Sequence, residues 1–70
     1  MNLFYAPNIN SGVKTYSFDK AESKHISRVL RKNEGDILHL TNGKGYLFEA
    51  KITDNNANKT QVKIVKETFV

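Results

Sequence analysis

Basic side chains recur along one segment of the chain at a spacing that suits contact with phosphate groups. Lys24 and Arg28 are four residues apart, Arg31 follows three residues later, and Lys32 extends the row. Residues three and four apart lie on the same side of a helix, so a nucleic-acid backbone could meet several of these cations at once. A solvated helix face has the same pattern, and the spacing alone leaves both interpretations open.

Patterns for catalysis and metal binding are absent from the sequence. His25 and His39 are the only histidines and there is no cysteine, so no recognisable zinc or copper ligand set occurs. The serines lack the strand-to-helix elbow of a hydrolase nucleophile. Asp19 and Glu22 have the spacing of a capping box, which explains this carboxylate pair more simply than acid–base catalysis. We therefore predict no catalytic residue, metal site or cofactor site in these 70 residues.

The segment TNGKG, residues 41–45, contains a pair of glycines that could cradle a phosphate. It matches neither a Walker loop nor a dinucleotide-binding fingerprint. The alternating residues on both sides instead indicate a tight hairpin turn, in which glycine supplies a positive φ. Lys44 is then at the tip of the turn, where its ammonium group could contact an anion.

Size and composition indicate one small globular domain with a preference for polyanions. The chain has 70 residues, 39% of them hydrophobic, including three Tyr and four Phe, and a formal net charge of +4. The lack of cysteine fits a reducing compartment. Neither a signal-peptide pattern nor an apolar run long enough to span a membrane is visible, and we therefore expect a cytoplasmic protein without a membrane partner.

The basic residues lie on one side of the chain only if their segment is helical, and the sequence predicts a helix from about Lys20 to Lys32. Asp19 caps its start, and Asn33 or Gly35 can take the left-handed conformation that ends it. At about 100° per residue, one face of this helix carries three apolar residues and the opposite side carries the basic ones. We expect Ile26, Val29 and Leu30 to anchor the helix on the core.

The remaining elements have the two-residue alternation of strands. Strands are expected at residues 3–6, 13–18, 36–40, 46–52 and around 62–64. In the fourth of these, Tyr46, Phe48, Ala50 and Ile52 share one face, so Tyr46 is expected in the core rather than stacked on a base. Five strands with one α-helix between the second and third predict a mainly β fold, a small and partly closed antiparallel β-barrel.

The stretch HISRVLRKNEGDILHLTNGKGYLFEAKI, from His25 to Ile52, resembles the N-terminal PUA-like domain of the ribosomal RNA small subunit methyltransferase E family. The family pattern is approximately H-x-x-x-V-L-R, then G-D, then a G-x-G turn, then a strand with A-x-I. The matching positions are His25, Val29, Leu30, Arg31, Gly35, Asp36, Gly43, Gly45, Ala50 and Ile52.

This resemblance implies that residues 1–70 form a single PUA-like RNA-binding domain from a longer chain. Members of the family carry a C-terminal knotted domain that binds S-adenosylmethionine and dimerises, and they methylate a uridine ring nitrogen of 16S rRNA. The implied partner is small-subunit ribosomal RNA, with S-adenosylmethionine and homodimerisation belonging to the whole protein. Arg28 and Arg31 match basic positions of the family helix, whereas Lys24, Lys32 and Lys44 are predicted RNA contacts from charge geometry alone.

Two other functions fit the same residues. The domain could be an interdomain or protein-interaction module whose basic helix faces acidic groups, without direct RNA contact. It could also be a stand-alone nucleic-acid-binding protein similar to an OB-fold. We call the first of these alternatives the packing module. A dependence of RNA affinity on salt distinguishes RNA binding from the packing module. A preference for unstructured single strands would favour the OB-like alternative.

Overall fold

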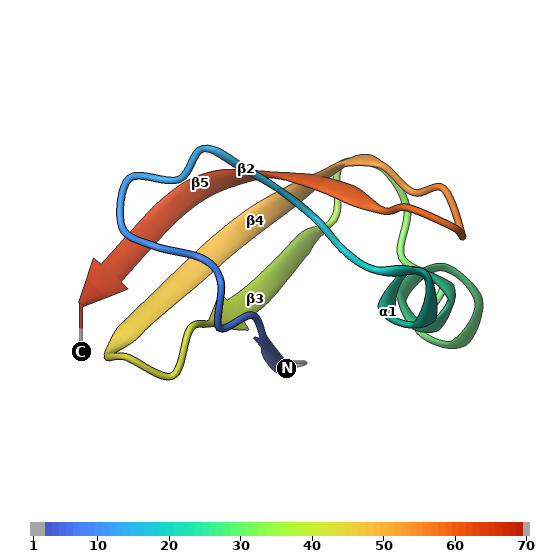
Figure 1. The fold of residues 1–70 in the computed structure, drawn as a ribbon. Helices are drawn as coiled ribbons and strands as arrows, with labels where there is room; N and C mark the ends of the chain where they lie inside the picture. Colours follow the sequence, from blue (N-terminus) through green and yellow to red (C-terminus); the bar gives the residue numbers. More distant parts are fainter. Residues whose placement is uncertain (1–2, 70) are drawn as a thin grey trace.

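The computed structural model describes residues 3–69, which form one curled five-stranded sheet and one short helical segment (Figure 1). The strands are β1 (Leu3–Tyr5), β2 (Thr15–Ser17), β3 (Ile37–Thr41), β4 (Tyr46–Asp54) and β5 (Gln61–Phe69). The helical segment consists of α1 (Lys20–Lys24) and a π-helical turn, η1 (His25–Val29). It lies at one end of the sheet, and the β3–β4 turn lies at the other end (Figure 1).

The order of the strands in the sheet is β1-β3-β4-β5-β2. The fold class predicted from the sequence, mainly β with a helix between the second and third strands, is confirmed. One pairing differs from the predicted all-antiparallel barrel, because β1 pairs with β3 in parallel. Parallel neighbours need a long crossover connection, and β2 together with the helix provides it. Since β1 comes first in the strand order, it is an edge strand.

The core fills the inner face of the sheet. Phe48, Ala50 and Ile52 of β4 are buried, as their alternation predicted, while Lys51 between them is exposed. Burying such apolar side chains stabilises the fold by roughly 25 cal/mol for each Å² removed from water. Within residues 3–69 the buried apolar cluster is Phe4, Ala6, Ile9, Phe18, Ile26, Leu38, Leu40, Phe48, Ala50, Ile52 and Val62.

The helix is anchored by fewer apolar residues than the sequence predicted. Ile26 is fully buried and Leu30 packs against the core, but Val29 is 66% exposed. The reason is the π-helical turn, in which the Leu30 N–H donates to the His25 carbonyl at 2.9 Å, five residues back instead of four. The wider turn advances each side chain less far around the axis, and Val29 therefore points away from the sheet.

Hydrogen bonds fix the helical segment at its start and at Ser23 within α1. At its start Asp19 Oδ1 accepts from the Glu22 N–H at 2.8 Å, which confirms the predicted cap. Buried Ser23 joins the helix to the residue before β5, because its Oγ accepts from the Thr60 N–H at 2.7 Å and donates to the Phe18 carbonyl at 3.3 Å. These bonds hold the helix rigidly against the sheet.

The helical segment ends at Val29, three residues earlier than predicted. Arg31 then takes the left-handed conformation, with a φ of 54°, and the Lys32 N–H donates to the Ile26 carbonyl at 3.0 Å. Gly35 also has a positive φ of 92°, as its place after the helix suggested. Left-handed conformations close many helices, usually at glycine, and an arginine is an unusual residue for this role.

Candidate nucleic-acid interface

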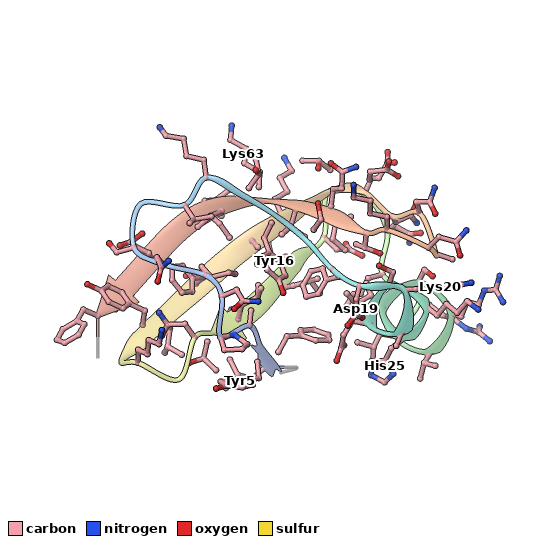
Figure 2. All side chains as sticks on the ribbon, viewed as in Figure 1. Tyr5, Tyr16, Asp19, Lys20, His25 and Lys63 are labelled. Atoms are coloured by element: carbon pink, nitrogen blue, oxygen red, sulfur yellow. The ribbon has the colours of Figure 1, made fainter. Side chains whose placement is uncertain are left out.

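The helical segment presents a row of exposed cations at one end of the molecule. Lys24, Arg28 and Arg31 are exposed and Lys32 is half-buried. Lys20, which the sequence analysis did not single out, lies four residues before Lys24 and extends the same row. Figure 2 shows Lys20 on the outer side of the helix, directed away from the sheet. We call Lys20, Lys24, Arg28, Arg31 and Lys32 the basic row.

Carboxylates do not neutralise this row. Within residues 3–69 the one ion pair is between Lys66 and Glu49, at 3.8 Å, on the neighbouring strands β5 and β4. The Asp36 carboxylate, a potential partner of Arg31, instead accepts from the Asn33 N–H at 2.8 Å. The Asp19 carboxylate is used by the helix cap. The cations of the row are therefore available to an external anion.

The backbone under the row carries two features that are frequent at functional sites. One is the π-helical turn at His25–Val29. The other is the left-handed conformation of Arg31, which costs a residue with a β-carbon about 1–2 kcal/mol. Both redirect the side chains at the end of the helix, and neither could be deduced from periodicity.

Lys44 is exposed but lies apart from the basic row. Its turn is held by buried Asn42, whose Oδ1 accepts from the Lys44 N–H at 2.8 Å and whose Nδ2 donates to the Ile9 carbonyl at 3.0 Å. This turn follows β3 at the end of the sheet opposite the helix (Figure 1). The structure thus brings four of the five predicted RNA-binding residues together and places the fifth, Lys44, elsewhere.

The short strand β1 lies between the two basic regions and borders a cavity of about 420 Å³ with the helix. Leu3, Phe4 and Tyr5 form one side of this cavity, and Ala21, Glu22 and His25 form the other. Tyr5 and His25 extend to the same side of the molecule (Figure 2). From the sequence, Glu22 was assigned only to the capping box and Tyr5 was not singled out; the signal for Tyr5 was its alternation with the buried residues Phe4 and Ala6.

The carboxylates at the start of the helix also affect a tyrosine inside the fold. Burial and, next, the negative charges of Asp19 and Glu22 raise the pKa of Tyr16, a half-buried residue of β2. The ring of Tyr16 packs edge-on against Phe18, with 5.0 Å between the ring centroids. Tyr16 is therefore part of the hydrophobic packing rather than of an exposed interface.

The other residues considered from the sequence have structural positions. Tyr46 is half-buried and stacks on Phe48, with ring centroids 6.1 Å apart, which confirms its predicted core role. His39 is half-buried on β3, and His25 is exposed with its ring edge-on to Phe4. No cluster of three potential metal ligands occurs among residues 3–69. No helix formed by those residues has the length and apolar character needed to cross a membrane.

Comparison with known proteins identifies similar domains. The family described as RNA methyltransferase PUA domain matches residues 18–65. A solved structure of a probable rRNA-methyltransferase from Porphyromonas gingivalis is 34% identical, with a TM-score of 0.83 over 100% of this chain. The ribosomal RNA small subunit methyltransferase E from Neisseria gonorrhoeae, solved bound to S-adenosyl methionine, is 26% identical, with a TM-score of 0.82 over 97% of this chain.

A predicted RNA methyltransferase from Thermotoga maritima is also similar, at 30% identity with a TM-score of 0.75 over 96% of this chain. In each case the matched region is a minor part of the other protein. The present chain spans 28% of the Porphyromonas and Neisseria chains and 30% of the Thermotoga chain.

Proposed function

This chain belongs to the family of RNA methyltransferase PUA domains, and on that premise we propose that it is an RNA-binding accessory domain that docks a methyltransferase on small-subunit ribosomal RNA. The observation that carries the proposal is the basic row, whose members are exposed except for half-buried Lys32 and form no ion pair among the described residues. A cationic row of this kind suits successive phosphates on an RNA backbone.

The rigidity of the helix supports this proposal. Ile26 is buried beneath the row and Ser23 is hydrogen-bonded to Thr60, so the helix cannot shift without breaking the core. Side chains presented on a rigid element lose less conformational freedom on binding than those on a mobile loop. The row therefore offers a preformed surface to folded RNA.

Phosphate contacts give affinity and orientation but carry no sequence information. We propose that the choice of the target, a uridine of 16S rRNA methylated on its ring nitrogen, belongs to the whole protein with S-adenosylmethionine as methyl donor. The cofactor in the Neisseria relative supports this assignment. Cytoplasmic localisation and dimerisation through a further domain remain predictions from the sequence.

The buried polar side chains within residues 3–69 serve the fold itself. The fully buried polar residues Ser23, Asn42 and Thr60 all form hydrogen bonds within the domain. Within residues 3–69 the one buried side-chain oxygen without a partner is Ser27 Oγ, and a single hydroxyl does not make a cofactor site. We assign none of these residues to S-adenosylmethionine.

The alternative function is the packing module, an interdomain or protein-interaction role without direct RNA contact. The two functions differ in their response to salt. RNA binding through the basic row predicts that affinity for a 16S rRNA fragment falls with a log–log slope of about 0.7 to 0.9 per phosphate contacted. Absence of binding at low salt would favour the packing module.

A further inference from the structure

The cavity between β1 and the helix has the size of a ligand site. Its volume of about 420 Å³ falls in the range of small-molecule pockets, roughly 300–1,000 Å³. We call it the β1–helix pocket. It is formed by an edge strand, and the Ala6 N–H donates to Thr41 of β3 at 2.8 Å. Strand alternation therefore directs the backbone groups of Tyr5 and Leu3 to the open edge, toward the pocket.

The lining combines flat rings with one carboxylate. Tyr5 is 69% exposed and His25 is also exposed, so each ring has a free surface on which a planar ligand could stack. Glu22 faces the same cavity. Its backbone N–H is engaged by Asp19, but within residues 3–69 its side chain forms neither a hydrogen bond nor an ion pair. Only half of the predicted capping box is thus formed, and the Glu22 carboxylate remains free to accept.

The pocket adjoins the basic row. Ala21 and His25 are four residues apart and form the helix row next to that of Lys20, Lys24 and Arg28. On its other side the pocket reaches Tyr5, whose ring lies against Gly43 in the turn that carries Lys44. We infer that a strand of RNA in contact with both the basic row and Lys44 runs along the mouth of the pocket.

We propose that the β1–helix pocket receives one unpaired RNA base that carries an amino group, guanine being the best match. This inference rests on the proposed RNA-binding function and adds a base-selective subsite to it. The base stacks on Tyr5 or His25, its Watson–Crick edge faces Glu22, and its phosphates lie on Lys24 and Arg28. Single-stranded bases are commonly recognised in this way, by aromatic stacking together with hydrogen bonds to the base edge.

The Glu22 carboxylate decides the preference among bases. A carboxylate only accepts hydrogen bonds, and it can accept two at once. Guanine offers two adjacent donors, its ring N–H and its amino group, which match both oxygens. Uracil offers one N–H between two carbonyl oxygens, which repel a carboxylate. The pocket therefore favours guanine over uracil, and also favours the single amino donors of cytosine and adenine over uracil.

The test compares two labelled RNA hairpins that are identical except for one bulged nucleotide, G or U. Their dissociation constants for the 70-residue chain are measured by fluorescence anisotropy at fixed salt. We expect the bulged-G hairpin to bind about tenfold more tightly, the lower part of the range for a good bidentate base contact. Glu22→Gln should abolish the preference for G, because an amide presents one acceptor and one donor, which pair equally well with the ring N–H and adjacent carbonyl of guanine and of uracil. The double variant Tyr5→Ala with His25→Ala removes both rings on which the base can stack and should weaken binding of the bulged-G hairpin by about tenfold.

Glu34→Gln is the matched control, since it removes the same charge from an exposed carboxylate outside the pocket. It should leave the ratio of the two dissociation constants unchanged. Equal binding of both hairpins by the wild-type chain, or a ratio insensitive to Glu22→Gln, would overturn the pocket while leaving phosphate binding intact. Failure of both hairpins to bind at low salt would instead contradict the proposed function itself. Binding of an extended peptide to β1 in place of either hairpin would overturn the base site and assign the open edge to strand addition.

Discussion

The ring of Tyr5 lies directly against Gly43, so closely that a β-carbon at position 43 would stand 2.8 Å from Cε1 of the tyrosine. This contact joins the edge strand β1 to the β3–β4 turn. It depends on glycine twice, because Gly43 also has a φ of 71°, which side chains disfavour. The position of Tyr5 at the mouth of the pocket is therefore set by a residue far from it in the sequence.

Replacing this glycine should displace the tyrosine. Gly43→Ala is expected to lower the free energy of unfolding by roughly 1–2 kcal/mol through the left-handed backbone and to move the Tyr5 ring, which NMR of the ring protons would detect. Gly12→Ala is the matched control, since Gly12 has a φ of 88° but open space around it. Tyr5 resonances that respond equally to both substitutions would argue against the contact.

Ser23→Ala should destabilise the domain by about 1–3 kcal/mol in urea unfolding. The substitution leaves the Thr60 N–H buried without a hydrogen-bond acceptor. A buried donor without a partner lowers the free energy of unfolding by about this amount. Ser17→Ala, at an exposed position of β2, should change stability by less than about 0.5 kcal/mol. Similar losses in the two variants would show that Ser23 does not tie the helix to Thr60.

Arg31→Gly should change the stability of the domain and its RNA affinity in opposite directions. Glycine relieves the left-handed backbone at this helix end, so the free energy of unfolding should rise by about 1 kcal/mol. RNA affinity should fall nonetheless, because one cation of the basic row is removed. Lys32→Gly removes a neighbouring cation at a position without a positive φ and should lower both quantities. A destabilised Arg31→Gly variant would contradict the strain argument.

Glu67 gives the fold a measurable response to acid. Hydrogen bonds from the Gly12 N–H and then from the Ser11 hydroxyl lower the pKa of Glu67. Its contribution to stability is therefore fully present above pH 4.5, the ordinary value, and is lost as the pH falls through the lower pKa of the folded state. The stability difference between the wild-type chain and Glu67→Gln should shrink in that window. A difference that stays constant down to strongly acidic pH would be incompatible with these bonds.

Alternation predicted most of the sheet, and the capping signal predicted the start of the helix. Both patterns are local, because the buried face of a strand is visible in its own sequence. Phe48, Ala50 and Ile52 are buried as expected, and Asp19 caps the helix. The parallel pairing of β1 was not predictable in this way. A strand of three residues carries no signal for the direction of its neighbour, which the path of the intervening chain determines.

The candidate site was predicted only in part for a related reason. Exposure of Lys24 and Arg28 follows from helical spacing, and the structure confirms it. Arg31 is exposed too, but it lies beyond the end of the helix in a left-handed conformation. Val29 was placed wrongly because the π-helical turn changes the rotation per residue, and its hydrogen bonds depend on tertiary packing. Tyr5 and Glu22 are 17 positions apart in the chain, and only the fold brings them to one cavity.

The most direct test of the central claim is the salt dependence of binding to a 16S rRNA fragment for two charge-matched double variants. Lys24→Glu with Arg28→Glu reverses two charges of the basic row, whereas Lys51→Glu with Lys63→Glu reverses two lysines paired across β4 and β5. The helix variant should bind much more weakly, with the log–log slope reduced by roughly 0.7 to 0.9 for each phosphate that the row no longer binds. The strand variant should keep the wild-type slope. An unchanged slope in the helix variant, or a greater loss of affinity in the strand variant, would contradict binding through the basic row.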